Sequence, residues 1–249
     1  MKTKNIIFIA FLVLSTSIVS CKKDHDIPTG EVFHPEHGGD TLAPGGAVNH
    51  EFVDLGLPSG ILWATCNVGA DTPEGYGVYF AWGETHPKNV YDWNTYKHCN
   101  GAESTLTKYC CNSNYGNNGY TDVLTTLSPE DDAATANWGT DWRMPTAEEW
   151  RELYQRTTNT WTSQNGVMGR LFTAINGNSL FIPAAGYYIG GSLYNNTSNA
   201  YYWSSSLVTV NPNYAWGLGF DRVEWSVSNC HRDEGQSVRA VRVSQALIH

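Results

Sequence analysis

An acidic cluster and an arginine raise the question of catalysis in the middle of the chain. Glu130, Asp131 and Asp132 are consecutive, and Arg143 follows them in the aromatic stretch WGTDWRMPTAEEW, residues 138–150. Two neighbouring carboxyl groups can act as a general acid and a general base. Carboxylates also stabilise the positive end of a helix dipole, and an arginine commonly pairs with a nearby acid such as Asp131 or Asp132. We therefore expect scaffold here, and no catalytic residues.

Other signatures of catalysis or metal binding are missing from the sequence. It contains no G-x-S-x-G, H-E-x-x-H, P-loop or dinucleotide motif, and no C-x-x-C pair. In the run HPEH, residues 34–37, a proline opposes the helix that would aim both histidines at one metal. A formal net charge of -9 disfavours nucleic acid, because phosphate binding requires a basic face. We expect a protein that is not an enzyme, with no cofactor, metal or nucleic-acid partner.

Two helices are predicted around the acidic cluster. The first covers residues 129–137, with Ser128 as its N-cap and Gly139 at its end. The second begins at Thr146, which forms a T-x-x-E capping box with Glu149.

Most of the remaining chain predicts strands joined by turns and polar loops. A Leu-Pro-Ser-Gly turn at 57–60 separates two strands, and an Asn-Gly pair at 176–177 indicates a hairpin. Further strand candidates are YYWSSSL, AWGLGF and QSVRAVRV. Residues 85–126 are polar and typical of a long loop. The composition, with 10 Trp, 14 Tyr and 24 Gly, suits such a β-rich fold.

The N-terminus carries the features of a targeting segment. A basic start is followed by an apolar run, Ile6 to Leu14, and by IVSC, which resembles a bacterial lipobox. We expect a lipoprotein signal peptide at 1–20, lipidation at Cys21 with palmitate among the acyl chains, and a flexible tether at 21–48. An ordinary signal peptide with a chance cysteine is the alternative. The run CKKDHD resembles export signals of surface lipoproteins in Bacteroidetes, which implies an outer-membrane, lipid-anchored, surface-exposed protein.

Five cysteines remain after Cys21, so at least one of them is free. The most plausible bridge joins Cys99 to Cys110 or Cys111, because it closes a short loop. Cys66 lies in an apolar run and is expected to be a small core residue. The pairing among these residues and Cys230 stays open.

Several sequence blocks together resemble one family. They are VDLGLPSGILWATCNVGA (53–70), YFAWGE (79–84), DDAATANWGTDWRMPTAEEWREL (131–153), LFIPAAGY (180–187), YWSSS (202–206) and GQSVRAVR (235–242). In this order they resemble the Fibrobacter succinogenes major paralogous domain of Bacteroidetes lipoproteins, over about residues 50–243. Ala240 departs from the family, which often has proline there. We place the domain at 49–249.

That family is similar to the C-type lectin-like superfamily. The resemblance implies an α+β fold with a mixed, mostly antiparallel sheet, two helices, first and last strands that meet, and long loops that form a binding face. The calcium-site motifs of lectins in this superfamily are missing, and Trp93-Asn94-Thr95 is only a partial echo of one. The resemblance therefore implies no calcium-bridged sugar site.

The late loops are the expected ligand-binding face. Their aromatic residues bring contact area at low entropy cost, and their asparagines both donate and accept hydrogen bonds. The candidates are Tyr194, Asn195, Asn196, Tyr201, Asn213, Tyr214, Asp221, Arg222, Glu224, Trp225, Asn229, His231 and Asp233. Ordinary turn chemistry is the alternative for each of them.

The expected ligand is a glycan or a protein at the cell surface. A structural or assembly role in a surface complex is the alternative. The segment also resembles targets of diversity-generating retroelements, which rewrite adenines, although Glu224 and Trp225 cannot arise from a rewritten Asn codon.

Overall fold

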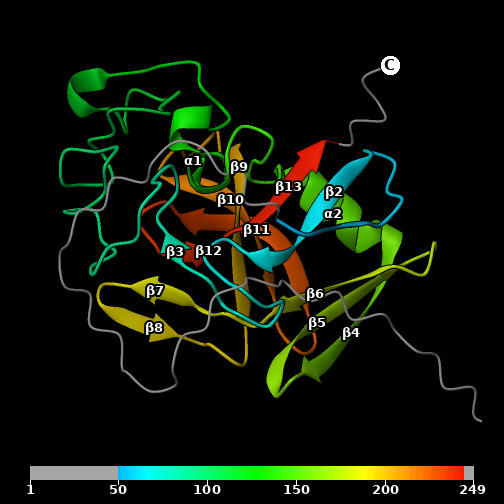
Figure 1. The fold of residues 1–249 in the computed structure, drawn as a ribbon. Coiled ribbons are helices and arrows are strands. Elements are labelled where there is room, and N and C mark those ends of the chain that lie inside the picture. Colours follow the sequence, from blue (N-terminus) through cyan, green and yellow to red (C-terminus); the bar gives the residue numbers. More distant parts are fainter. Residues whose placement is uncertain (1–49, 244–249) are drawn as a thin grey trace, which may run out of the picture.

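The computed structural model describes residues 50–243 as an α+β domain of mostly antiparallel strands (Figure 1). The predicted signal peptide, Cys21, the tether and the HPEH run lie outside the described residues. Within the described range, no helix is long and apolar enough to cross a membrane. The predicted class, α+β and mostly antiparallel with two α-helices, is confirmed for this part of the chain.

The strands form four sheets. Three of them have the orders β1-β2-β13, β4-β5-β6 and β7-β8, while the central sheet has the order β11-β10-β9-β12-β3. The strands are β1 (Phe52–Asp54), β2 (Ile61–Asn67), β3 (Tyr79–Phe80), β4 (Thr157–Gln164), β5 (Val167–Ala174), β6 (Ser179–Pro183), β7 (Tyr187–Ile189), β8 (Ser192–Tyr194), β9 (Ala200–Leu207), β10 (Tyr214–Phe220), β11 (Trp225–His231), β12 (Gln236–Ser237) and β13 (Arg239–Val243). The β12–β9 pair is parallel, so the central sheet is mixed.

The first and last parts of the domain meet at β2. This fully buried strand pairs antiparallel with β1 on one side and with β13 on the other. The Leu-Pro-Ser-Gly turn between β1 and β2 forms as predicted, with the Gly60 amide donating to the Leu57 carbonyl at 2.9 Å. The Asn176-Gly177 turn between β5 and β6 is also confirmed.

The second predicted helix is confirmed as α2 (Ala147–Arg156). Thr146 and Glu149 complete the capping box, so each side chain satisfies a backbone amide of the first turn. The helix buries Trp150 and Leu153 against a core that includes Trp63 of β2 and Phe172 of β5. The Trp150 indole donates to the Trp203 carbonyl at 3.1 Å, which fixes α2 to the central sheet.

The first predicted helix is shorter than expected, and its cap is different. Residues Pro129–Asp131 form a 3-10 turn, η2, and the α-helix α1 is Ala133–Trp138; a second 3-10 turn, η1, is Asn117–Gly119. Asp132 has an extended backbone and accepts hydrogen bonds from the amides of Ala134 and Thr135. Ser128 is the N-cap residue of η2, as predicted, but its side chain makes no capping bond, and the Asp132 carboxylate caps α1 as a separate helix.

Arg143 pairs with Glu149 rather than with the predicted Asp131 or Asp132. Its two terminal nitrogens contact the two Glu149 carboxylate oxygens at 2.7 and 2.5 Å. This fork geometry is available because Glu149 is already held at the start of α2 by its cap. The stretch 138–150 is therefore a helix junction, as expected from its capping signals.

Four strands were not predicted. β4 and β11 are amphipathic strands with polar residues on one face, and β7 and β8 have only three residues each. The β4–β5 hairpin turns at Asn165-Gly166, where both residues have positive φ. An Asn-Gly pair is a strong hairpin signal, so this turn could have been found from the sequence.

The predicted disulfide between Cys99 and Cys110 or Cys111 was wrong, because all three thiols are free, as is Cys230. The three thiols point to different backbone carbonyls, those of Trp93, Asn112 and Thr209. Burial raises the pKa of the Cys230 thiol to about 12, so that it is not reactive as a thiolate at neutral pH. Cys66 is buried in β2 as expected, and it is disulfide-bonded, which the sequence did not predict.

The α2 capping box gives a direct stability prediction. Thr146→Ala removes the acceptor for the Glu149 amide, which costs about 1 kcal/mol, and lowers Tm by about 2–4 °C. Thermal unfolding measured by circular dichroism tests this, with the exposed loop variant Ser104→Ala as control. Equal Tm values for Thr146→Ala and the parent would contradict the assigned cap.

Candidate functional site

The predicted site residues separate into three groups on the central sheet and the hairpin β7–β8. Asn213, Tyr214, His231 and Asp233 meet a loop that the sequence did not implicate. Tyr194 and Tyr201 form a second group with Tyr187. Asp221, Arg222, Glu224 and Trp225 lie at the β10–β11 turn. Asn196 and Asn229 are exposed and belong to none of these groups.

The first group has an aromatic wall. Tyr214 of β10 lies directly opposite His231 of β11, and their ring centroids are 4.2 Å apart. Trp93, from the long loop, meets the His231 ring edge to face at 6.2 Å. All three rings are half-buried, so each keeps some surface for a ligand.

Two buried polar atoms next to this wall have no hydrogen-bond partner among residues 50–243. Asn213 is 4% exposed and donates from Nδ2 to the Glu103 carboxylate at 3.3 Å, whereas its buried Oδ1 has no partner. His231 Nδ1 is also buried and has no partner. Buried polar atoms in folded proteins are almost always satisfied by protein or by bound molecules. These two atoms therefore mark a place where a polar ligand or water completes the structure.

Two carboxyl groups beside the wall carry raised pKa values. Burial raises the pKa of Asp233 to about 6, with Asp92 and Glu103 adding to the shift and Lys88 opposing it. Burial and the neighbouring Asp233 raise the pKa of Glu234 to about 7. Burial also lowers the pKa of His231, which Glu103 partly offsets. We call the set Trp93, Glu103, Asn213, Tyr214, His231, Asp233 and Glu234 the acidic-aromatic face.

A tyrosine cluster adjoins this face. Tyr187 of β7 lies 4.7 Å from Tyr201 of β9 and 6.0 Å from Tyr194 of β8, measured between ring centroids. Burial and then the Glu234 carboxylate raise the pKa of Tyr187, so Glu234 is the link between the two groups. Asn195 contributes through a hydrogen bond to the Tyr201 side chain, which lowers the Tyr201 pKa against a larger effect of burial.

The third group serves the fold. The Trp225 ring stacks on Tyr154 of α2 with centroids 3.4 Å apart, and it packs against the core that contains Phe220. The Asp221 carboxylate accepts from the amides of Val223 and Glu224 and so shapes the β10–β11 turn. Trp225 and Asp221 thus have structural roles in the fold. Arg222 and Glu224 are exposed at the turn.

The sequence prediction missed the loop residues Trp93 and Glu103. They lie more than a hundred residues before His231 in the chain, and only folding brings them next to it. The sequence signals at Trp93 were an aromatic residue in a polar loop and the partial motif Trp93-Asn94-Thr95. Figure 1 shows this loop, in teal to green, on the same side of the domain as the β7–β8 hairpin.

The loop is attached to the hairpin and to the sheet. Tyr91 and Gly190 exchange two backbone hydrogen bonds of 2.8 Å, and Tyr188 and Gly235 exchange bonds of 2.8 and 3.0 Å. The buried Arg232 donates to Tyr96 OH and to the carbonyls of Lys108, Tyr109 and Pro212. These bonds hold the loop beside β10 and β11, where the acidic-aromatic face forms.

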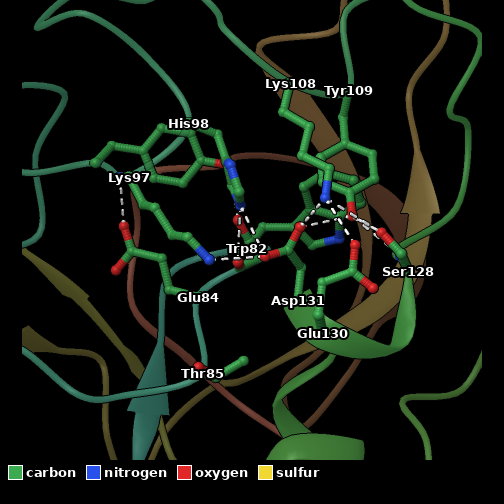
Figure 2. A network of polar contacts seen from close by, with 12 residues as sticks. Trp82, Glu84, Thr85, Lys97, His98, Lys108, Tyr109, Ser128, Glu130 and Asp131 are labelled. Atoms are coloured by element: carbon green, nitrogen blue, oxygen red, sulfur yellow. Dashed lines mark hydrogen bonds and ion pairs between the residues drawn. The ribbon is translucent and has the colours of Figure 1, made fainter.

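Asp131 of η2 fastens the same middle part of the loop (Figure 2). Its carboxylate accepts from Lys97 at 2.7 Å, Lys108 at 2.6 Å and Tyr109 OH at 2.8 Å. Burial alone would raise the pKa of Asp131, but hydrogen bonds from Lys108, Lys97 and Tyr109 outweigh burial and lower the pKa to about 2. His98 lies 3.6 Å away, and burial lowers its pKa to about 4, so it is neutral at pH 7. Asp131 is therefore a structural anchor.

A cavity of about 350 Å³ lies away from this face, at the stretch 138–150. Trp142, Arg143 and Arg242 are among its lining residues. Arg143 is already paired with Glu149, and Asp131 and Asp132 are buried with partners of their own. Within residues 50–243, no group of three or more His, Cys, Asp or Glu side chains is placed to hold a metal ion.

Comparison with known proteins gives a family. The model of the Lcl C-terminal domain matches residues 56–242, which is most of the described chain. No curated protein and no solved structure matches the chain.

Trp225 is expected to affect stability. Trp225→Ala removes the stack on Tyr154 and exposes core surface, so the free energy of unfolding should fall by about 2 kcal/mol or more. Urea unfolding followed by fluorescence measures this change. Arg222→Ala, at the same turn but exposed, should stay within about 0.5 kcal/mol of the parent. Similar losses for both variants would contradict the packing role.

Glu234 gives a pH-dependent prediction. Because its pKa is raised from 4.5 to about 7 in the folded protein, the folded state binds more protons between these values, and stability falls as pH rises through this window. Glu234→Gln removes the buried charge, so its Tm should exceed that of the parent by about 2–4 °C at pH 8 and match it near pH 4. Thermal unfolding at both pH values measures the difference, with the exposed Glu224→Gln as control. A Tm difference that is the same at both pH values would count against the raised pKa.

Proposed function

Because the chain belongs to the Lcl C-terminal domain family, we propose that it is a non-catalytic, ligand-binding protein of the cell surface. The ligand is a glycan or a protein, and it binds to the acidic-aromatic face and the adjoining tyrosine cluster. The observation that carries this proposal is the pair of unsatisfied atoms, Asn213 Oδ1 and His231 Nδ1, beside three half-buried rings.

The composition of the face supports binding. Tyrosine and tryptophan contribute large contact areas while losing little side-chain entropy, and they are enriched where binding energy concentrates. Tyr194 is 47% exposed, which leaves its ring available to a partner. The bonds of Arg232 and the β7–β8 hairpin hold the face in one conformation, which reduces the entropy lost on binding.

The finer assignments belong to the same proposal. We place the domain in the C-type lectin-like superfamily and near the Fibrobacter succinogenes major paralogous domain. The mixed antiparallel sheet, the two helices and the junction of β2 with β13 support this placement. Lipidation at Cys21 would anchor the protein to the outer membrane and leave the domain at the surface. The complete pairing of Arg143 and Asp131 supports a role without catalysis.

Two alternatives remain proposals. A structural component of a surface complex would use the same face as a permanent interface. A target of diversity-generating retroelements would vary the exposed positions, such as Asn195, Asn196 and Arg222, while Trp225 stays fixed as a packing residue. A template repeat beside the gene would support that second alternative, and its absence would remove it.

Binding by the purified chain tests the proposal. We expect a ligand from either a glycan array or a pull-down from cell envelopes, and binding should survive a calcium chelator. Tyr194→Ala should weaken this binding about tenfold because an exposed tyrosine can supply over 1 kcal/mol of contact energy.

Tyr120→Ala is the matched control, since Tyr120 is 38% exposed and lies outside both groups. Loss of binding in the chelator would reveal a cation site. A stable partner subunit that co-purifies with the chain would favour the structural alternative. No ligand in either assay would reject the proposed function.

A further inference from the structure

The acidic-aromatic face has too few donors for its acceptors. Asn213 and Gln236, both at least 96% buried, each direct an amide N–H at a carboxylate of the face, Glu103 and Glu234 respectively. The other amide atom in each case, Asn213 Oδ1 and Gln236 Oε1, is buried and has no partner. Both amides thus leave an oxygen acceptor unsatisfied, which calls for a donor from outside the described residues.

The charge around these acceptors is negative. Asp92, Glu103 and Asp233 act on one another closely enough to raise the pKa of Asp233, and Glu234 adjoins them. Lys88 acts on Asp233 and lowers its pKa, but its ammonium group already contacts the Glu84 carboxylate at 2.9 Å. An additional cation at this face would therefore relieve repulsion between carboxylates and gain hydrogen-bond acceptors.

The aromatic wall fits the same ligand. The faces of Trp and Tyr rings carry negative charge density and attract cations that lie over them. Trp93 and Tyr214 flank His231, and Glu103 acts on His231 and contacts Asn213. A primary ammonium, with three donors and no acceptor, matches rings, carboxylates and the unsatisfied amide oxygen together.

We propose that the acidic-aromatic face binds the ammonium group of a lysine side chain on a protein ligand. This inference rests on the proposed function and names the ligand class of the same site. The primary contacts are Glu103 and Asp233, with Trp93 and Tyr214 as the flanking rings and the buried Asn213 as the side chain that holds Glu103.

The surroundings favour a protein over an amino sugar. Two cavities in the domain, of about 350 and 330 Å³, are lined by residues outside the acidic-aromatic face. The face instead continues into the cluster of Tyr187, Tyr194 and Tyr201, which enlarges the area a protein segment can cover. Interfaces between proteins are typically larger than a sugar ring and rich in tyrosine.

A comparison of matched probes tests the inference on the full chain. The probes are octalysine, the same peptide acetylated on every Nε, and a chitosan octamer, with Kd measured by calorimetry at fixed salt. We expect binding of octalysine and at least tenfold weaker binding of the acetylated peptide, because acetylation removes the charge and two of three donors.

Two variants separate a specific site from general attraction to an acidic protein. Glu103→Gln keeps an acceptor for Asn213 but removes the charge, and should weaken octalysine binding about fivefold or more. Glu148→Gln removes an equal charge from α2, 83% exposed and outside the face, and should change binding less than twofold. Both positions are exposed, so both variants are expected to fold.

Each result supports or overturns the inference. Equal losses for the two variants, or equal binding of the acetylated peptide, overturn it. Chitosan binding that is stronger than octalysine binding assigns the ammonium to an amino sugar and overturns the protein ligand. If octalysine does not bind, while the binding of an array or envelope ligand still depends on Tyr194, the lysine inference is overturned and the proposed function stands. If every assay fails, both fall.

Discussion

The buried guanidinium of Arg232 is the interaction on which the candidate site depends. A buried charge is costly unless its donors are satisfied, and here they reach a tyrosine hydroxyl and three carbonyls from separate segments. The ring of Trp82 lies 4.8 Å from the guanidinium carbon and adds a cation–π contact. Because His231 and Asp233 are its chain neighbours, the same anchor that holds the long loop also places two residues of the acidic-aromatic face.

Carboxylates in this domain divide into two kinds according to how many donors they meet. Asp131 accepts from two lysines and a tyrosine, and its pKa falls to about 2 despite burial. Asp233 and Glu234 are also buried, but they face other carboxyl groups and few donors, and their pKa values rise to about 6 and 7. The first kind is complete within the fold, whereas the second is the kind on which the proposed binding face depends. This contrast separates the scaffold from the site more clearly than residue type does.

Local signals predicted the parts of the fold that are governed by local interactions. The capping box at Thr146 and the turns at Gly60 and Asn176 require only neighbouring residues, and all three are confirmed. The pattern at Ser128 predicts one continuous helix, but Ser128 begins only the 3-10 turn η2. Asp132 caps α1, and its carboxylate also accepts the distant Met144 amide, which no local pattern reveals. The short strands β7 and β8 could not be predicted for the same reason, because strands of three residues are defined by their pairing partners.

The sequence by itself determined the class of the fold, the capped helix α2 and the tight turns. Which residues share the acidic-aromatic face was decided only by tertiary structure. Trp225 and His231 stand on one strand with similar sequence surroundings, yet one packs on α2 and the other meets Trp93 and Glu103 from a remote loop. The physical reason is that the burial and the electrostatic environment of a site depend on all the residues that lie near it in space. A sequence pattern records neighbours along the chain, and the Arg232 anchor is what brings the remote ones together.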